Sequence, residues 1–288
     1  MNLCDIQTIK PLLARHGFHF SKSLGQNFLT APWVPEDIAA SAGLDADTAV
    51  LEIGPGIGCL TVELARRAQK VVAVELDRAL LPVLAETLQD YPNTEVIHGD
   101  ILKLDLQTLA AEHFAGLRPV VCANLPYNIT TPTLTKLIDS GLFEQITVMI
   151  QREVALRLCA PAGSSDYGAI SLYIAYHTEP ILLFDVPPDC FIPAPKVTSA
   201  VITLKKRTVP PVETDPKALF HVIKLAFAQR RKTLLNCLST GLPHASKADL
   251  SKIIESLGHD TRIRGETLDL TAFAKLADAL LAAEVLRM

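Results

Sequence analysis

Short runs of β-branched residues alternate with longer amphipathic stretches between about residues 48 and 149. We predict strands at residues 49–54, 70–76, 94–99, 119–124 and 146–151. The stretches between them, such as CLTVELARRA and ALLPVLAETLQ, carry apolar residues at helical spacing. Because consecutive parallel strands need a crossover long enough for a helix, this alternation predicts a parallel sheet with helices on both faces.

Two further apolar runs, 170–186 and 198–207, extend this pattern, and the first is interrupted near Pro180. No helical pattern separates them, so we predict an antiparallel pair at the edge of the sheet. After Arg207 the proline-rich segment TVPPVETDPKA leads to helical patterns at about 216–239, 247–257 and 270–286. The predicted fold is α/β, with a seven-stranded, mostly parallel sheet and a small all-helical carboxyl-terminal domain.

The 288 residues exceed the usual size of a single core, and we place the domain boundary after residue 207. Residues 1–207 form the larger domain, which includes an amino-terminal flap at 1–47, and residues 208–288 form the helical one. The six cysteines and eight histidines show no spacing typical of metal ligands, so no metal is expected. No apolar run approaches the length of a membrane span, and we expect a soluble, cytoplasmic protein.

The segment LEIGPGIG at 51–58 ends the first strand and opens a helix, where backbone amides accept polar or negative ligand groups. Gly54 and Gly56 allow the backbone to approach such a ligand closely. The spacing differs from the G-x-G-x-x-G of dinucleotide-binding folds, and no Walker lysine follows. A plain strand-to-helix turn is the alternative interpretation.

Two acids mark the carboxyl ends of the next two strands, the edge where open α/β sheets bind ligands. Glu75 is placed to accept hydrogen bonds from both hydroxyls of a ribose, and Asp100 from the amino group of an adenine. Each acid alone is better explained as a helix cap or a solvated turn residue. Together with the glycine turn they indicate a cofactor that carries adenosine without requiring a pyrophosphate.

The sequence resembles the class I S-adenosylmethionine-dependent methyltransferases. Its motifs are similar, in order and over nearly the whole chain, to those of the ribosomal RNA small-subunit adenine dimethyltransferases. They are KSLGQNFL (22–29), LEIGPGIG (51–58), VELD (74–77), GDIL (99–102), NLPYNITTP (124–132), FIPAPKVTSAV (191–201) and FAQRRKTLLN (227–236). The resemblance implies that loop 124–127 holds the target adenine and that S-adenosylmethionine contacts Asn27, Leu29, Gly54, Glu75, Asp100 and Asn124.

The loop NLPY matches the demands of methyl transfer to an adenine amine, whose nitrogen shares its lone pair with the ring. The side-chain oxygen of Asn124 and the backbone carbonyl of Leu125 can accept both amine hydrogens, which frees the lone pair for attack. Pro126 holds the chain in an extended turn that aims these acceptors. Tyr127 can stack on a base that is flipped out or unpaired. A structural turn is the alternative for this loop.

Two apolar segments complete the predicted site. Phe191 in FIPAPKV is a candidate for a second aromatic wall, although a core phenylalanine explains it equally well. Asn27 in LGQNFL belongs either to a turn that buries Phe28 and Leu29 or, as the resemblance implies, to a flap over the methionine end of the cofactor.

A basic run occurs in FAQRRKTLLNCL, at Arg230, Arg231 and Lys232. Helical spacing would place the apolar residues from Phe227 to Leu238 on one stripe and this run near the opposite side. The net charge of −4 argues weakly against nucleic acid, but the run is a candidate for binding an RNA backbone. A solvated surface is the alternative interpretation.

The resemblance implies an enzyme that dimethylates two adjacent adenosines in the 3′-terminal hairpin of small-subunit (16S) ribosomal RNA, during biogenesis of that subunit. The implied partners are this RNA and the pre-30S subunit, with the protein acting as a monomer and without a membrane. A large-subunit adenine methyltransferase of the macrolide-resistance type is one alternative. An RNA-binding assembly factor without catalytic activity is the other.

Overall fold

The computed structural model describes residues 1–21, 25–229 and 231–286, which divide into two compact units. The first unit comprises Met1–Ala155 with Ile181–Lys206, and the second unit comprises Leu156–Pro180 with Arg207–Met288. This division differs from the boundary predicted after residue 207 chiefly in residues 156–180, which belong to the second unit.

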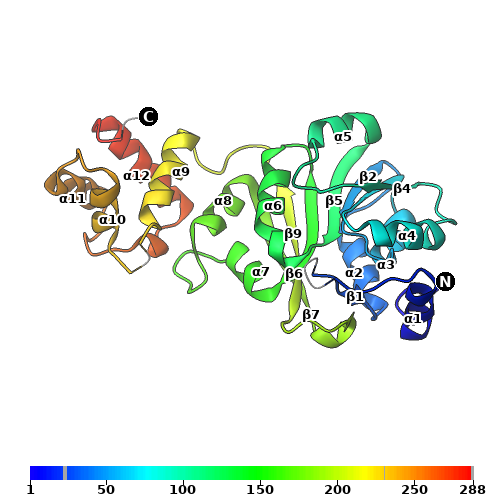
Figure 1. The fold of residues 1–288 in the computed structure, drawn as a ribbon. Helices are drawn as coiled ribbons and strands as arrows, with labels where there is room; N and C mark the ends of the chain where they lie inside the picture. Colours follow the sequence, from blue (N-terminus) through cyan, green and yellow to red (C-terminus); the bar gives the residue numbers. More distant parts are fainter. Residues whose placement is uncertain (22–24, 230, 287–288) are drawn as a thin grey trace. The chain divides into compact units, whose positions relative to one another are not determined.

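A seven-stranded sheet forms the centre of the first unit, in the strand order β4-β3-β2-β5-β6-β9-β7 (Figure 1). Neighbouring strands from β4 to β6 pair in parallel, whereas β9 pairs antiparallel with β6. This is the predicted seven-stranded, mostly parallel sheet, with the two late strands at one edge. The strands are β2 (Thr48–Ile53), β3 (Lys70–Glu75), β4 (Thr94–His98), β5 (Arg118–Asn124), β6 (Gln145–Gln151), β7 (Thr178–Val186) and β9 (Ser199–Lys206).

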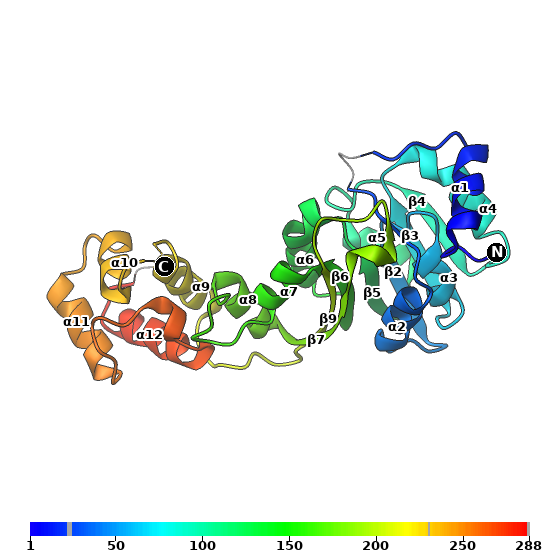
Figure 2. The ribbon, with the colours of Figure 1, turned by 90° about the horizontal axis from the view of Figure 1, so that it is seen from below.

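Helices cover both faces of this sheet, which explains why every residue of β2 is buried. One face packs against a continuous core that includes Leu12 of α1, Ile38 of α2, Leu64 of α3 and Leu84 of α4. The buried leucines of α5 and α6 lie outside that cluster, and Figure 2 shows α2 and α6 on opposite sides of the strands. These helices are α1 (Ile6–Arg15), α2 (Trp33–Ser41), α3 (Cys59–Ala65), α4 (Leu81–Thr87), α5 (Leu106–His113), α6 (Thr130–Asp139) and α7 (Arg152–Leu158).

A second, two-stranded sheet joins two motifs that are far apart in the sequence. Strand β1 (Phe28–Leu29) pairs antiparallel with β8 (Phe191–Ile192), so that Leu29 lies opposite Phe191. The amide of Thr30 extends this pairing by donating to the carbonyl of Cys190 at 2.8 Å. The amino-terminal flap and the FIPAPKV segment therefore form one structural element.

The strand predicted at 170–186 is wrong in its first half. Residues Ala169–His177 form helix α8 in the second unit, and only the second half is strand β7. The isoleucines and tyrosines of this run favour a strand locally, but Leu172 and Tyr176 pack into the helical core of the second unit. Ser171 also accepts a hydrogen bond from the amide of Gly168, which stabilises the start of the helix.

The second unit is helical and has its own core, around Leu219, Leu238 and Phe273. The helix predicted at 216–239 is wrong as a single element, because Thr233 starts a new helix by accepting from the amide of Asn236 at 3.4 Å. The described residues between the two helices are not helical, so the predicted continuous apolar stripe does not form. The helices are α8, α9 (Pro216–Ala226), α10 (Leu234–Gly241), α11 (Lys247–Ser256) and α12 (Leu270–Ala282).

Within the described ranges, no helix combines the length and the apolar character needed to cross a membrane.

Candidate functional site

A cavity of about 1040 Å³, including its open mouth, lies at the carboxyl ends of β2 to β5 in the first unit. The connections that follow these parallel strands meet at this edge of the sheet. The cavity brings together every predicted cofactor and adenine residue of this unit. They are Asn27, Leu29, Gly54, Gly56, Glu75, Asp100, Asn124, Leu125, Pro126, Tyr127 and Phe191.

The glycine turn after β2 forms one wall of the cavity. Gly54 and Gly56 have φ values of +69° and +61°, which side chains other than glycine rarely adopt. A Cβ atom on Gly56 would also lie only 3.2 Å from two ring carbons of Phe28. The backbone conformation therefore favours glycine at both positions. At Gly56 the packing of Phe28 from the flap is a second reason.

Two carboxyl groups face the cavity from the neighbouring strands. Glu75 ends β3 with a residue exposure of only 6%, and its Oε1 accepts from the amide of Asp77 at 2.8 Å. Burial raises the pKa of Glu75, while the amides of Asp77 and Gly56 oppose the shift. Asp100 follows β4, accepts from the amide of Leu102 at 3.0 Å, and is more exposed. The ends of β3 and β4 thus provide one buried and one more accessible carboxyl group.

The loop after β5 contributes the other polar wall. Asn124 is the last residue of β5, and the amide of Leu125 donates to the carbonyl of Met149 at 3.1 Å. Pro126 has φ −56° and ψ 130°, so the chain leaves the strand in an extended conformation, as predicted. This geometry holds the carboxyl end of β5 and the start of the loop against β6.

Tyr127 is oriented by the strand at the antiparallel edge. Its hydroxyl lies 2.7 Å from the hydroxyl of Ser199 in β9, and burial raises the pKa of the phenol. The ring is thereby fixed at one end, which leaves its face to line the cavity. Sequence reasoning missed Ser199, although it lies in the quoted motif FIPAPKVTSAV.

The flap is attached to the site by a side chain that the sequence analysis did not single out. Gln26 donates from Nε2 to Oδ2 of Asp77 at 2.7 Å, which links the flap to the turn after β3. Asn27 lines the cavity but donates to the carbonyl of Gly25 at 3.0 Å. Phe191 is buried at 5% exposure and also lines the cavity, so the core and wall interpretations both describe it.

Glu52 is the most unusual lining residue that sequence reasoning missed. It lies inside β2 with 1% exposure, and burial raises its pKa to about 8. Its Oε2 has no hydrogen-bond partner among the described residues. The sequence signal that could have identified it is the presence of an acid within the apolar run AVLEIG.

The predicted basic run lies in the second unit and does not line the cavity. Arg231 and Lys232 are exposed residues between α9 and α10, and neither forms an ion pair with another described residue. Arg230 lies outside the described residues. In the part of the chain that the structure describes, no three His, Cys, Asp or Glu side chains are grouped as metal ligands.

Comparison with known proteins agrees with this geometry. The family model described as ribosomal RNA adenine dimethylase matches residues 17–274. A protein named ribosomal RNA small subunit methyltransferase A, from Geobacillus thermodenitrificans (strain NG80-2), is 49% identical over 277 residues, which cover 94% of each chain.

Two solved structures are similar over most of the chain. A dimethyladenosine transferase from Plasmodium falciparum has a TM-score of 0.76 and 26% identity, over 89% of this chain and 98% of that one. The 23S rRNA methyltransferase ErmE has a TM-score of 0.69 and 26% identity, over 88% and 99%. The likeness therefore extends through both units.

Proposed function

Because the chain belongs to the ribosomal RNA adenine dimethylase family, we propose that its cavity holds S-adenosylmethionine beside a target adenine of small-subunit ribosomal RNA. The protein is an S-adenosylmethionine-dependent ribosomal RNA adenine dimethyltransferase. We assign the substrate as two adjacent adenosines in the 3′-terminal hairpin of 16S ribosomal RNA.

The residues of the cavity fit S-adenosylmethionine. Gly54 and Gly56 leave room beside the backbone that a Cβ atom would restrict. Glu75 and Asp100 line the cavity at the ends of neighbouring strands, where Glu75 would accept from the ribose hydroxyls and Asp100 from the adenine amino group of the cofactor. The flap residues Asn27 and Leu29 would cover the methionine end. The bound cofactor supplies an electrophilic methyl group on a positively charged sulfur.

The loop after β5 prepares the nucleophile. The Oδ1 of Asn124 and the backbone carbonyl of Leu125 accept the two hydrogens of the adenine amine, so that its nitrogen becomes more tetrahedral. Tyr127, held by Ser199, and Phe191 provide apolar surfaces against which a flipped base can stack. The contribution of this chain is mainly alignment, because displacement at a sulfonium carbon needs no strong base.

One observation carries the assignment: the turn after β2, the acids after β3 and β4, and the loop after β5 line a single cavity. This arrangement would be redundant in an assembly factor without catalytic activity. ErmE, which is named for 23S rRNA, and the Plasmodium transferase are each 26% identical to this chain. The Geobacillus protein, which is named for the small subunit, is 49% identical to it. The small-subunit assignment is therefore preferred over the macrolide-resistance type.

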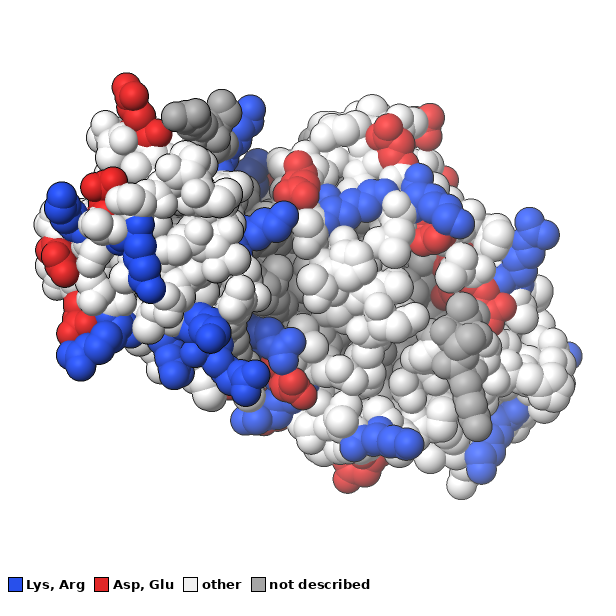
Figure 3. All heavy atoms as spheres, turned by 60° about the vertical axis from the view of Figure 1, so that its left-hand side comes forward, with Lys and Arg blue, Asp and Glu red and all other residues white. Residues whose placement is uncertain are grey.

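The second unit is the proposed RNA-binding domain. Arg231 and Lys232 are exposed cations without a described ion-pair partner, whereas Arg262 is paired with Asp260 at 2.7 Å. Figure 3 shows Lys and Arg side chains gathered toward the lower left of the view. Such groups suit a phosphate backbone, which attracts unpaired cations irrespective of sequence. Arg230, Arg231 and Lys232 are assigned to this contact, in a cytoplasmic monomer that acts on the pre-30S subunit.

The deciding experiment is the substitution Asn124→Ala. We expect transfer of labelled methyl groups to unmethylated 30S subunits to fall by at least about 100-fold, because the amine loses an acceptor used at the moment of attack. Retention of the subunit on the protein should stay within about twofold. The matched control is Asn128→Ala, an exposed asparagine in the same loop that does not line the cavity. Unchanged transfer by Asn124→Ala contradicts the assignment.

A further inference from the structure

Glu52 occupies a costly position for an acid. It lies in the central strand β2, its Oε2 has no hydrogen-bond partner among the described residues, and it lines the cofactor cavity. The hydroxyl of Thr61 in α3 approaches it but is itself a buried atom without a described partner. A buried carboxylate without a nearby cation is unfavourable, and the Thr61 hydroxyl offsets this cost only in part, so the empty cavity favours the neutral form of the side chain.

The groups that face Glu52 do not supply a positive charge. They are Glu75 of β3, Cys59 of α3 and Cys122 of β5. Burial raises the pKa of Glu52 to about 8, and the negative charge of Glu75 adds to this effect. At neutral pH, most molecules therefore carry a proton on Glu52.

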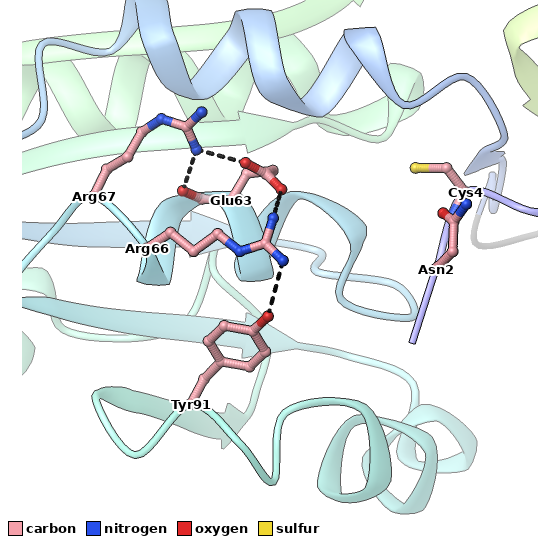
Figure 4. Close-up of polar contacts among 6 residues, drawn as sticks. All are labelled: Asn2, Cys4, Glu63, Arg66, Arg67 and Tyr91. Carbon is pink, nitrogen blue, oxygen red and sulfur yellow. Dashed lines mark hydrogen bonds and ion pairs between the residues drawn. The ribbon is translucent and has the colours of Figure 1, made fainter.

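Glu63, on the neighbouring helix, shows how a buried acid is compensated elsewhere in this fold (Figure 4). It is only 8% exposed, but Arg67 binds its Oε2 at 2.6 Å and Arg66 binds its Oε1. Glu63 does not line the cavity. The two acids are buried to a similar degree and differ in whether the chain provides a cation.

We propose that Glu52 is protonated in the empty cavity and releases this proton to solvent when the positively charged S-adenosylmethionine binds. This inference rests on the proposed function. The missing cation is then the sulfonium of the cofactor itself. S-adenosylhomocysteine has an uncharged sulfur in its place, so Glu52 regains the proton after methyl transfer. Glu52 is thus a specificity residue that favours the methyl donor over its product.

The proton can be counted by calorimetry on the full chain, in phosphate and in Tris at pH 7. For the wild type we expect release approaching one proton per S-adenosylmethionine bound, and clearly less for S-adenosylhomocysteine. Affinity for S-adenosylmethionine should rise up to about tenfold between pH 6 and pH 7, since binding releases a proton. Glu52→Gln should bind without proton release and with a flat pH dependence.

Controls separate this inference from the proposed function. Glu63→Gln should release protons as the wild type does, because that acid lies outside the cavity. Release that persists in Glu52→Gln would assign the proton to another group, such as Glu75, and overturn the inference. Binding of S-adenosylmethionine without any proton release overturns it too, but leaves the proposed function intact. Failure to bind S-adenosylmethionine at all contradicts the proposed function.

A second measurement needs no variant. Infrared difference spectra of the wild type should lose the carbonyl stretch of a protonated carboxylic acid when S-adenosylmethionine is added. S-adenosylhomocysteine should leave most of that band in place. If S-adenosylmethionine leaves the band unchanged, Glu52 does not ionise and the proposal is wrong, even if Glu52→Gln fails to fold.

Discussion

Glu52 and Glu63 both bury a carboxyl group, and the unfavourable burial of a negative charge is avoided in a different way for each. Glu63 is neutralised by Arg66 and Arg67, whereas Glu52 retains a proton because no described cation is near. A carboxyl group whose pKa is higher in the folded chain than in the unfolded chain destabilises the fold as pH rises between the two values. For Glu52 this range extends from the ordinary value of 4.5 to about 8.

At the residue scale we therefore predict that Glu52→Gln stabilises the protein at alkaline pH. Relative to the wild type, its free energy of unfolding should increase by roughly 2–4 kcal/mol between pH 5 and pH 9, because the amide never has to ionise. Urea unfolding at several pH values measures this difference. Parallel pH profiles for the two proteins would show that Glu52 is ionised in the fold.

At the scale of elements, the site depends on contacts between segments that are distant in the sequence. Strand β1 carries the flap onto β8, and Phe28 packs against the turn at Gly56. Gln26 then ties the flap to Asp77. The flap is therefore held near its middle, by strand pairing at Phe28 and Leu29 and by a hydrogen bond from Gln26 to a carboxylate.

We predict that Gln26→Ala weakens the affinity for S-adenosylmethionine by about 3- to 10-fold. The substitution removes a hydrogen bond to a charged group, which contributes on the order of 1 kcal/mol at a partly exposed position. Calorimetry measures the affinity, and the melting temperature should change by only a few degrees. Gln7→Ala, an exposed glutamine of α1, is the control. Equal affinities for the two variants would contradict a role of this hydrogen bond in holding the flap.

At the scale of the whole molecule, the chain separates a cofactor unit from a helical unit that has its own core. The proposed roles of the two units differ in their dependence on salt. Binding to an RNA backbone releases counterions and weakens as salt increases. Binding of S-adenosylmethionine in a cavity of the first unit should depend on salt much less.

The double substitution Arg231→Glu with Lys232→Glu tests this separation. We predict that RNA affinity falls by about tenfold or more and that its dependence on salt becomes less steep, since two phosphate contacts are lost. Affinity for S-adenosylmethionine should not change. Lys247→Glu with Lys252→Glu, at two exposed lysines of α11, produces the same change in net charge and is the control. An unaltered salt slope would return the basic run to the solvated-surface interpretation.

Periodicity in the sequence was enough to predict the five parallel strands and the antiparallel strand β9, because local apolar spacing follows directly from which side chains are buried. It was misleading at 170–177 and at 227–233. The first run is rich in strand-forming residues but packs among helices, and Thr233 caps a new helix inside an apparent continuous one. In both places, packing and capping outweigh local propensity.

The motifs alone were sufficient to name the cavity residues at the strand ends and the glycine turn, because these are local features, but they did not indicate Glu52. The links that hold those residues in place were not predictable from them. Ser199 meets Tyr127, Gln26 meets Asp77, and β1 meets β8 only after the chain has folded. The protonation of Glu52 was not predictable from the motifs either. A pKa depends on the charges and solvent around a group, and these neighbours come from distant segments that folding brings together.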